Sequence, residues 1–599
     1  MEGRVVMEIR RIDIQNFRGI KSLTWNIPAG RRFLALIGPG DSTKSTILTA
    51  IDMTLSDRWN LSFTDTDFYQ ADVTNPISIR VTLTGLPPDL RQHDVLGLHL
   101  SGLDVTGELH QDPEDDHEVC VTICLTVDGE LEPKWTVFRP GKGADEATVS
   151  SATRRLIGTY KVDERIDAHL RWTKTSALGR LTETKHGATT LLVTANRTAR
   201  AAVAASIPDE LGQLAKSIQD KMHDLGSGEF GSLQPGLDQS LSSSSGNLAL
   251  YEGAVPLTNY GLGSRRLAGI AAQQLAHNGK AFLLVDEIEY GLEPHRLINL
   301  LAQLRRTDVP GQVFVTTHSP IVLRHLDAAD LAVVRSLADG RVEVKCLAAG
   351  DEDIQKLLRA SPEAFLARRI AIGEGKTEFG LLLGLLDQWD AEAAVNGTPV
   401  SAALGVVAVE GSGSETVTRG EILDDLGYEV TLLMDSDVDA VNVKADAFAA
   451  RPGAAVVRWR DNFNLERALC EVLDADGLTA LIQLGIELSE NPEDGATNFL
   501  THLKNFGLPR ELTSLVVGDW ISSGYALPEA RDLVARVASK KSWFKQVHRG
   551  RALASHLMAA RHLHDSDELA KVNAIRTAIF DPRPTSVKQG NASKGETVS

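Results

Sequence analysis

A glycine-rich loop between an apolar run and a helical run constrains this chain more than any other feature. The run RRFLALIG predicts a buried strand, the loop GPGDSTKST follows it directly, and ILTAIDMTL has the pattern of a helix. A phosphate-binding loop requires this order, because backbone N–H groups and the helix N-terminus hold the phosphates. The sequence therefore predicts an α/β fold whose first domain binds a nucleotide.

The loop residues have separate expected roles. Those expected to contact the nucleotide are Gly38, Pro39, Gly40, Asp41, Ser42, Thr43, Lys44, Ser45 and Thr46. Lys44 should reach the β- and γ-phosphates of ATP, and the Ser45 hydroxyl should ligate Mg²⁺. The usual pattern has glycine before the lysine, but Thr43 occupies that position. Glycine permits backbone conformations that a β-branched residue disfavours, so Thr43 predicts weaker affinity or slower hydrolysis, while the site itself is kept.

Further motifs follow in a fixed order along the chain. NYGLGSRRLAGIAAQQL carries Ser264, AFLLVDEIEYGLEP is an apolar strand ending in Asp286 and Glu287, and QVFVTTHSP leads to His318. With the opening EIRRIDIQNFRGIKSLTWNI, they resemble the signature, Walker B and switch motifs of ABC ATPases of the SMC/RecF-like branch. The resemblance implies that Asp286 holds Mg²⁺, Glu287 polarises the attacking water, His318 is the switch and Ser264 acts in trans. Gln70 is the candidate Q-loop residue, although a solvated loop glutamine is nearly as good an explanation.

Two acidic strand ends mark the second half of the chain. GEGKTE at 373–378 follows the apolar run ARRIAI, and MDSD at 434–437 follows YEVTLL. The segment between them alternates helix, strand and helix, which predicts a βαβαβ unit and a parallel sheet. The carboxyl ends of parallel strands share one edge of a sheet, where open α/β folds keep their sites. Glu374, Asp435 and Asp437 should therefore meet there and bind a hard divalent cation such as Mg²⁺, Mn²⁺ or Ca²⁺.

Phosphodiester hydrolysis is the chemistry that such a metal site would support. A cation activates water and neutralises developing charge, and a second cation can stabilise the leaving oxygen. Glu378 and Glu466 are the expected ligands of a second ion, and Lys545, or failing that Lys541, would add positive charge at the scissile phosphate. Taken singly, EGKTE also fits a helix start with acidic first-turn residues, and DSD also fits a polar turn.

The second half resembles a TOPRIM domain, the metal-dependent phosphoryl-transfer module of topoisomerases, primases and one family of nucleases. The whole chain resembles the OLD (overcoming lysogenization defect) nucleases, which join an ABC ATPase to a TOPRIM domain and include relatives of the Gabija nuclease. This resemblance implies a metal-dependent DNA endonuclease or nickase, dimeric through its ATPase half, with nucleotide state controlling access of DNA. It also implies a role in defence against phage or foreign DNA, alongside a partner protein.

Three other functions fit parts of the sequence. The chain could be a nucleotide sensor with an inert TOPRIM half, although its acidic positions are intact. A topoisomerase would need a strand-attacking tyrosine, and neither Tyr428 nor Tyr525 has a convincing setting. A DNA-repair or structural ATPase of the RecF type would leave the second domain unexplained.

Charge and composition exclude a few classes. A formal net charge of −18 over 599 residues argues against a generic nucleic-acid coat protein. Basic residues gather near the C-terminus around Trp543 and Phe544: Lys540, Lys541, Lys545, His548, Arg549, Arg551, Arg561 and His562. By itself such a stretch predicts a solvated helix face, whereas a nearby phosphodiester site would favour a DNA channel.

The expected organisation has six segments. They are an ATPase part at 1–150, an inserted helical dimerisation subdomain at 151–245, a second ATPase part at 246–347, a linker helix at 348–362, a TOPRIM nuclease domain with C-terminal helices at 363–580, and a disordered tail at 581–599. The first residues, MEGRVVMEIRR, lack the apolar segment of a signal peptide, and no apolar run approaches the ~20 residues of a membrane span. We therefore expect a cytoplasmic protein with no membrane partner.

Overall fold

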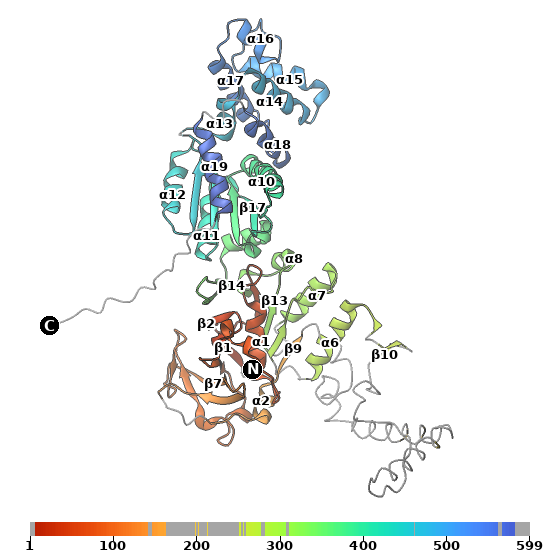
Figure 1. Cartoon of the computed structure of the whole chain (residues 1–599), viewed down its shortest axis with the longest axis vertical. Coiled ribbons are helices and arrows are strands. Elements are labelled where there is room, and N and C mark those ends of the chain that lie inside the picture. The colour runs from red at the N-terminus through yellow and green to blue at the C-terminus, as the bar shows by residue number, and fades with distance from the viewer. Residues whose placement is uncertain are drawn as a thin grey trace, which may run out of the picture.

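Three parts are stacked along the long axis of the molecule (Figure 1). The computed structural model describes residues 6–141, 147–162, 259–276, 282–306, 311–460, 462–560 and 566–581, with isolated positions between 198 and 256. A part with two large sheets lies at one end, a parallel-sheet domain lies in the middle, and a group of helices lies at the other end. No described helix is long and apolar enough to cross a membrane.

The first large sheet is antiparallel, with the order β2-β1-β4-β7-β5-β6 and with β8 paired to β7. Its strands are β1 (Glu8–Phe17), β2 (Ile20–Asn26), β4 (Ile77–Thr84), β5 (Ser101–Leu103), β6 (Leu109–His110), β7 (Glu118–Val127) and β8 (Pro133–Phe138). In β4, Ile77, Ile79 and Val81 are fully buried and the residues between them are not, as expected where one face of a sheet is covered. The covered face packs against the second sheet.

The second sheet has the order β15-β14-β3-β13-β12-β9, and all of its neighbouring strands are parallel except β14 and β15. The strands are β3 (Phe33–Ile37), β9 (Thr159–Val162), β12 (Phe282–Val285), β13 (Val313–Thr316), β14 (Leu331–Ser336) and β15 (Val342–Cys346). The helices of this part are α1 (Lys44–Leu55), α2 (Ser151–Ile157), α6 (Leu262–Ala276), α7 (Pro294–Leu304) and α8 (Pro320–Arg324). Both faces are covered: Leu34 and Leu36 of β3 enter the core shared with the first sheet, while Ala35 and Ile37 enter the core on the other face.

The strand β9 corrects one predicted boundary. It pairs in parallel with β12 over Thr159 to Val162, inside the segment predicted to be an inserted subdomain from Ser151. The pattern of helical residues around Ser151 hid a four-residue strand, because so short a strand carries almost no periodicity. The nucleotide-binding part therefore extends to Val162, and most of the predicted insertion lies outside the described residues. So does nearly all of the predicted tail.

The middle domain is a four-stranded parallel sheet with the order β17-β16-β18-β19. Its strands are β16 (Arg369–Gly373), β17 (Val406–Glu410), β18 (Glu429–Met434) and β19 (Ala454–Arg458), and its helices are α10 (Lys376–Asn396), α11 (Thr416–Asp425), α12 (Asp439–Ala449) and α19 (Asp567–Phe580). The predicted βαβαβ unit is confirmed in type and order. The order of strands reverses between β16 and β18, so the loops after these two strands meet at a switch point.

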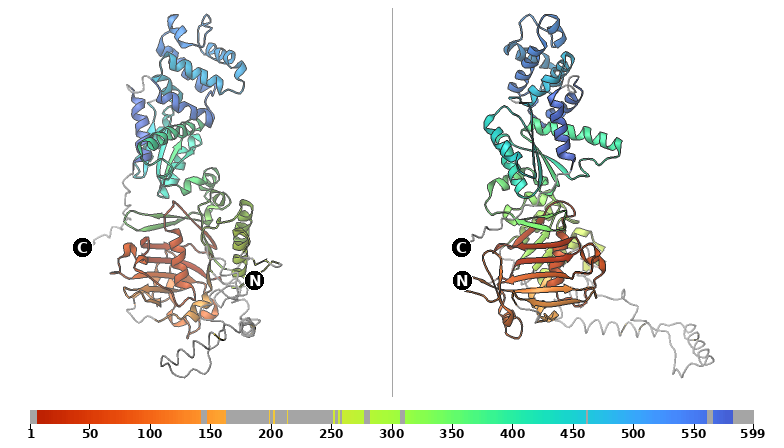
Figure 2. Two further views of the ribbon diagram at one scale, coloured as in Figure 1. Left: turned by 45° about the vertical axis from the view of Figure 1, so that its right-hand side comes forward. Right: turned by 60° about the vertical axis from the view of Figure 1, so that its left-hand side comes forward.

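The far part contains α13 (Leu465–Val472), α14 (Ala475–Glu487), α15 (Pro492–Asn505), α16 (Val517–Ser522), α17 (Leu527–Lys540) and α18 (Val547–Met558). These helices share a core with α10 that includes Trp389, Trp520, Trp543 and Phe544. The last helix, α19, returns beside the parallel sheet (Figure 2), where Arg369 donates hydrogen bonds to the carbonyl oxygens of Ile579 and Phe580.

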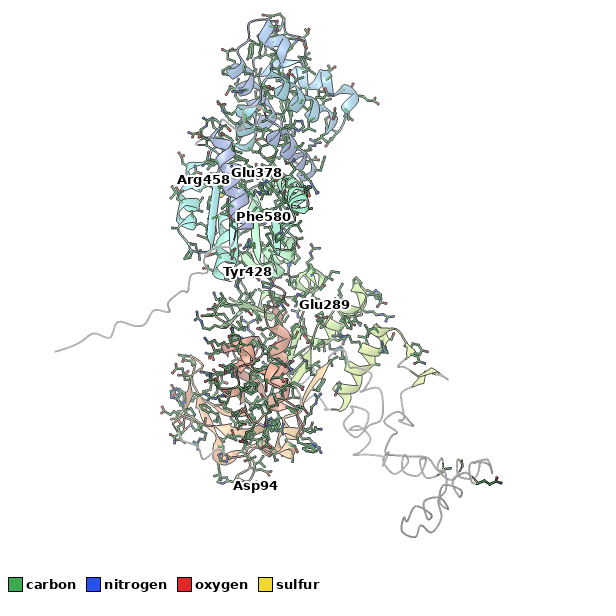
Figure 3. The ribbon with its side chains drawn as sticks, in the orientation of Figure 1. Asp94, Glu289, Glu378, Tyr428, Arg458 and Phe580 are labelled. Atoms are coloured by element: carbon green, nitrogen blue, oxygen red, sulfur yellow. The ribbon has the colours of Figure 1, made fainter. Side chains whose placement is uncertain are left out.

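The junction between the nucleotide part and the parallel-sheet domain is a continuous apolar core. One cluster runs from Leu331 of β14, through the predicted linker helix α9 (Glu352–Ala360), to Ile370 of β16. The Tyr428 hydroxyl donates to the Phe365 carbonyl oxygen at 2.7 Å, and the Arg335 guanidinium lies 4.8 Å from the centre of the Tyr428 ring. Figure 3 shows Tyr428 at the end of its domain that faces the nucleotide part and Glu378 toward the helices.

Candidate nucleotide site and candidate metal centre

The phosphate loop joins β3 to α1, as the sequence predicts. Gly38 has φ +135°, and a Cβ atom there would lie 2.3 Å from the Val334 carbonyl oxygen of the neighbouring strand. Only glycine can pass so close to β14. Lys44 is buried, with 4% of its surface exposed. Its ammonium group donates to the carbonyl oxygens of Gly38 and Pro39 and to the Ser42 hydroxyl, at 2.8–3.1 Å.

Thr43 adopts the conformation that the motif normally assigns to glycine. Its φ of 66° and ψ of 14° are left-handed, and it caps α1 at its N-terminus. A left-handed β-branched residue costs roughly 1–2 kcal/mol. The Thr43 hydroxyl donates to the Ser42 carbonyl oxygen at 2.6 Å. The loop thus keeps its shape despite the substitution, at a local cost in strain.

Asp286 connects this loop to the ends of two neighbouring strands. It follows β12, and one carboxylate oxygen accepts hydrogen bonds from Ser45 at 2.8 Å and from Thr316 at 2.6 Å. The Lys161 ammonium of β9 lies 3.9 Å from the other oxygen. Glu287 is exposed and has a φ of 47°, a strained conformation that is held by its N–H bond to the Thr316 hydroxyl.

Burial and the neighbouring charges shift the pKa of Lys44 in opposite directions. Burial lowers the pKa of Lys44 to about 8, and the carboxylates of Asp41, Asp286 and Glu289 oppose this shift. The pKa of His318 is lowered, first by partial burial and then by the charge of Lys44. The Glu289 carboxylate accepts hydrogen bonds from the Thr317 hydroxyl at 2.8 Å and from the His318 N–H at 2.6 Å. Lys44, Asp286 and His318 therefore form one electrostatic unit.

Three residues of this unit were not anticipated. Arg266 of α6 is buried and donates to the carbonyl oxygens of Asp286 and Glu287, Glu289 orients the His318 segment, and Lys161 faces Asp286. The second glutamate of VDEIE and the second arginine of GSRRL are visible signals in the sequence for two of them. No such signal marks Lys161, because the sequence did not predict the strand β9 that carries it.

Three predicted nucleotide residues have no described contact with Lys44 or Asp286. Thr46 lies in the first turn of α1, while Gln70 is exposed, with φ 55°, and donates to the Tyr69 hydroxyl at 3.4 Å. Ser264 lies in the first turn of α6, where its hydroxyl accepts a hydrogen bond from Arg296 at 3.4 Å. A role of Ser264 in trans requires a second protomer and remains a prediction.

The second group of predicted residues meets at the switch point of the parallel sheet. Glu374 follows β16 and Asp435 follows β18, and the Glu374 carboxylate accepts a hydrogen bond from the Asp435 N–H at 2.8 Å. The Asp435 carboxylate in turn accepts from the N–H of Leu465, at the start of α13, at 3.0 Å. Glu378 and Glu466 lie in the first turns of α10 and α13 and are only 6% and 9% exposed. Asp437 is exposed and acts electrostatically on the other four carboxyl groups.

These carboxyl groups resist ionisation together. Burial, followed by repulsion from neighbouring carboxylates, raises the pKa of Glu374 to about 7 and that of Asp435 to about 10. The pKa of Glu466 rises to about 7, and that of Glu378 is also raised, with burial again the first cause. Packing several carboxylates into one buried space is unfavourable unless a cation neutralises them.

Lys545 is the cation that acts on this group. Its charge lowers the pKa of both Glu378 and Glu466, against their overall upward shift. The helix α18, which follows Lys545, packs closely against α10: a Cβ atom at Gly550 of α18 would lie 2.4 Å from the Thr377 carbonyl oxygen of α10. Lys541, the other predicted choice, instead lies 5.8 Å from the centre of the Phe506 ring.

The basic C-terminal stretch is only partly available to a ligand. Trp543 and Phe544 are buried in the helical core and cannot stack on bases at the surface. Arg551 forms a two-pronged ion pair with Asp387 of α10, at 2.6 and 2.8 Å, and Arg549 donates to the Trp543 carbonyl oxygen. Lys540, Lys541, Lys545 and His548 are exposed, and the two remaining predicted basic residues lie outside the described residues.

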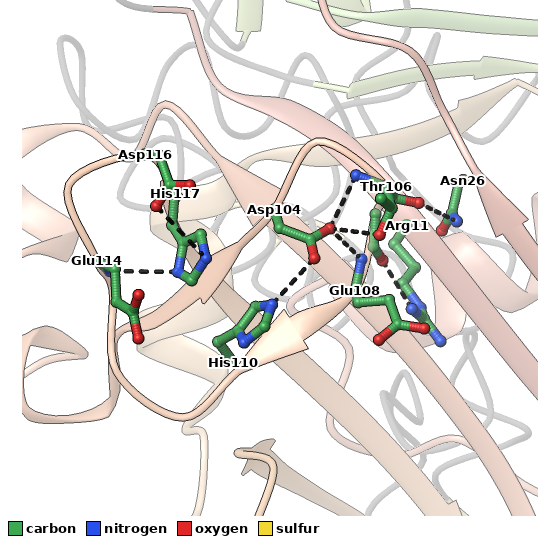
Figure 4. A network of polar contacts seen from close by, with 10 residues as sticks. Arg11, Asn26, Asp104, Thr106, Glu108, His110, Glu114, Asp116 and His117 are labelled. Carbon is green, nitrogen blue, oxygen red and sulfur yellow. Dashed lines mark hydrogen bonds and ion pairs between the residues drawn. The ribbon is translucent and has the colours of Figure 1, made fainter. Parts of the chain in front are cut away.

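A third polar group lies on the antiparallel sheet (Figure 4). His110 contacts the Asp104 carboxylate at 3.0 Å, which raises the pKa of the imidazole and lowers that of the carboxyl group. His117 stacks on His110 with ring centres 4.2 Å apart and lies near Glu114 and Asp116. The His117 Nδ1 atom accepts the Glu114 N–H at 3.3 Å. Glu114 and Asp116 are exposed, and exposed acidic groups commonly gather without an ion, so we interpret this group as a stabilised loop.

One family model matches the part of the chain that holds the nucleotide site. Residues 33–324 match the family described as "AAA domain, putative AbiEii toxin, Type IV TA system". A search of curated proteins found no match.

Among solved structures, the chain is similar to an SMC head bound to the C-winged helix domain of ScpA, at 16% identity over 58% of this chain and 99% of that chain, with a TM-score of 0.33. It is also similar to the SMC head domain from Thermotoga maritima, at 14% identity over 57% of this chain and 100% of that chain, with a TM-score of 0.27. A third similar structure is an SMC head with an extended coiled coil and the C-terminal domain of ScpA from Pyrococcus furiosus, at 14% identity over 59% and 98% of the two chains and a TM-score of 0.32.

The family match covers the phosphate loop, Asp286 and His318 in one segment, and the β3-loop-α1 unit gives that segment the geometry of a phosphate site. The first half of the chain is therefore a nucleotide-binding ATPase-type domain.

Proposed function

We propose that this protein is a divalent-metal-dependent DNA endonuclease or nickase whose activity is controlled by the nucleotide state of its ATPase domain. In this proposal the parallel-sheet domain acts as a TOPRIM module, and the chain works as OLD-type nucleases do. The observation that carries the proposal is a group of carboxyl groups at one edge of the parallel sheet, in which the Glu374 carboxylate accepts the Asp435 N–H and Glu374, Glu378, Asp437 and Glu466 all raise the pKa of Asp435. Lys545 acts on Glu378 and Glu466. Among the described residues, no three of these side chains have carboxylate oxygens within 4.8 Å of one another, so a bound cation would have to draw them together.

The donor set fits a hard divalent cation. All five side chains offer carboxylate oxygens, which Mg²⁺ and Mn²⁺ prefer as ligands. The raised pKa values of Glu374 and Asp435 mean that the buried group is short of positive charge, which a bound cation would supply. Glu378 also accepts the Gly375 N–H at 2.9 Å, so it caps α10 as well as acting on the other carboxyl groups.

The residues divide into distinct roles. Glu374, Asp435 and Asp437 would hold one cation, with Glu378 and Glu466 available to a second. A bound cation supplies an activated water and neutralises charge on the phosphodiester transition state. The N–H of Leu465 fixes the direction of the Asp435 carboxylate, and the Asp435 N–H fixes that of Glu374. Lys545 would add a positive charge where the scissile phosphate approaches the buried glutamates.

Nucleotide control and assembly complete the proposal. The ATPase domain would bind ATP with Mg²⁺ held by Ser45 and Asp286, with Glu287 and His318 acting on the γ-phosphate. Two protomers would pair through this half, so that Ser264 of one completes the site of the other. The proposal further includes a cytoplasmic role in defence against foreign DNA, together with a partner protein; the matching family description names a putative toxin.

A plasmid-nicking assay tests the proposal directly. Supercoiled plasmid is incubated with the full chain and Mg²⁺, Mn²⁺ or Ca²⁺, each with ATP, ADP or no nucleotide. We expect nicking with at least one metal and its loss in Asp435→Ala, while nucleotide binding is unchanged. Asp446→Ala is the matched control, because Asp446 is an exposed aspartate of α12 paired with Arg458. Unchanged nicking by Asp435→Ala would refute the site, and no nicking under any condition would favour a nucleotide-sensing ATPase instead.

A further inference from the structure

One side chain of the parallel-sheet domain reaches the phosphate loop. The Arg368 guanidinium donates to the Gly40 carbonyl oxygen at 3.3 Å, and the same Nη2 atom lies 3.5 Å from the Asp41 carboxylate. Gly40 and Asp41 belong to the loop that holds Lys44, whereas Arg368 immediately precedes β16. The contact therefore brings together two parts that are more than three hundred residues apart in the chain.

The parallel-sheet domain determines where Arg368 lies. The Arg368 N–H donates to the Gly405 carbonyl oxygen at 2.8 Å, just before β17. Gly405 has φ +69°, and a Cβ atom there would come within 3.0–3.2 Å of the Cβ, Cγ and Cδ atoms of Arg368. The aliphatic part of the arginine thus lies flat against a glycine that leaves room for it. At the junction with the nucleotide part, the continuous apolar core and the Tyr428–Phe365 hydrogen bond hold the parallel-sheet domain in place.

Asp41 explains why the loop needs this arginine. The Asp41 side chain is 96% exposed, and its charge raises the pKa of Lys44. A carboxylate within a loop that binds the phosphates of a nucleotide repels them, since like charges a few ångströms apart interact unfavourably. A guanidinium beside it offsets that repulsion and can itself donate to phosphate oxygens.

The strand after Arg368 leads to the other site. Arg368 stands just before β16 and Glu374 just after it, so the five residues of one buried strand separate them. At about 3.3 Å per residue, the backbones of these two residues are on the order of 20 Å apart. A rigid strand thus carries a contact to the nucleotide loop at one end and a candidate metal ligand at the other.

We propose that Arg368 is a positioning residue of the nucleotide site that the second domain contributes: it neutralises Asp41 so that the loop accepts a nucleoside triphosphate. Through β16, nucleotide bound at the loop is then sensed at the carboxylates around Glu374. This second half of the proposal rests on the proposed function, while the first half depends on nucleotide binding alone.

Equilibrium titration with a fluorescent ATP analogue tests the first half. In full-length protein with Mg²⁺, we expect Arg368→Ala to weaken binding about five- to tenfold at low ionic strength, and less at ~0.5 M salt, because exposed charges are screened. Arg368→Lys should recover part of the affinity. In the double variant Asp41→Asn/Arg368→Ala, binding should return to within about twofold of the wild-type affinity. If Arg368→Ala acted only by disturbing the structure, the second substitution would not restore binding.

Two controls separate this role from a structural one. Arg359→Ala removes an exposed arginine of α9 and should bind the analogue like the wild-type protein. The melting temperature of Arg368→Ala should stay within about 1 °C of the wild-type value, because an exposed ion pair contributes little to folding. Wild-type affinity in Arg368→Ala, or no rescue by Asp41→Asn, would overturn the proposal.

Plasmid nicking tests the second half. In the wild-type protein we expect the ratio of nicking with and without nucleotide to differ from one, and in Arg368→Ala at saturating nucleotide we expect it to approach one. A ratio in the variant equal to that in the wild-type protein would refute the link through β16. If no protein nicks, the proposed function fails, but the titration still decides whether Arg368 serves the nucleotide site.

Discussion

The nucleotide site and the acidic site occupy equivalent places in two sheets but differ in charge balance. Both lie at the carboxyl ends of parallel strands, where loops after neighbouring strands converge. At the nucleotide site, the carboxylates of Asp41, Asp286, Glu287 and Glu289 are accompanied by Lys44, Lys161, Arg266 and Arg368. At the acidic site, five carboxyl groups are accompanied by Lys545, and four of them have raised pKa values.

This difference indicates what each site can bind. A site that carries its own cations suits a polyanion that arrives with a metal ion, as ATP does with Mg²⁺. A site with excess buried negative charge suits cations first, and a phosphodiester only after they have bound. The arrangement of charges, more than the shared position in the sheet, separates the two functions.

The largest expected effect is the loss of nucleotide binding in Lys44→Ala. Lys44 is buried at the loop, and its truncation removes the charge that would meet the phosphates, so we expect affinity for an ATP analogue to fall at least ~100-fold. We expect Mn²⁺ to raise the melting temperature of the wild-type protein through the acidic site, and Lys44→Ala should show the same rise. Lys356→Ala, which removes an exposed lysine of α9, is the matched control. Normal ATP binding by Lys44→Ala would mean that the phosphate loop is misassigned.

The second variant, Gly550→Ala, changes the packing of α18 against α10 beside the acidic site. In Gly550→Ala, the new Cβ would lie 2.4 Å from the Thr377 carbonyl oxygen, so α18 must move away from α10 and shift Lys545. We expect a loss of about 1–3 kcal/mol in the free energy of unfolding and a loss of nicking greater than about tenfold. Gly518→Ala in α16, where the nearest atom lies 3.9 Å away, should leave both unchanged. Wild-type stability in Gly550→Ala would show that the two helices can separate freely.

In the absence of metal, the repulsion among the carboxyl groups of the acidic site should make the stability of the folded protein depend on pH. The pKa of Glu374 in the folded protein, about 7, lies above the ordinary glutamate value of 4.5, so between these values the folded protein binds more protons than the unfolded chain. Stability must therefore fall as pH rises through this window. In the presence of a chelator, we expect the melting temperature of Glu374→Gln to fall less than that of the wild-type protein from pH 4.5 to 7.5. Added Mn²⁺ should reduce the difference, and parallel curves would contradict the proposed repulsion.

The smallest effect is expected for Thr43→Gly. The change removes roughly 1–2 kcal/mol of left-handed strain but adds roughly 0.5–1 kcal/mol of chain entropy in the unfolded state. We expect a melting temperature within about 3 °C of the wild-type value and ATP hydrolysis faster by up to about tenfold. Single-turnover and steady-state rates would measure this effect. A slower variant would mean that the threonine methyl or hydroxyl has a positive role in turnover.

Much of the fold could be predicted because its signals are local. The apolar runs before Gly38, Glu374 and Asp435 are strands, and the helices after Gly38 and Glu374 follow from their periodicity. The helix α12 after Asp435 was not predicted. The predicted parallel order also held, since short crossovers leave few alternatives. The strand containing Lys161 was missed because four residues give no pattern. Trp543 and Phe544 suggested a binding surface, but burial of their large rings against α15 and α14 places them in the core.

The sequence by itself determined which chemistry is available: a phosphate loop with a threonine at its strained position, and carboxylates at the ends of two strands. These depend on residue type and on neighbours within a few positions. Only the tertiary structure decided which charges meet. Glu466 acts on Asp435, Lys545 acts on Glu378 and Glu466, and Arg368 contacts Asp41, through packing between elements that lie far apart in the chain. Such contacts depend on the relative placement of sheets and helices, which local sequence patterns do not encode.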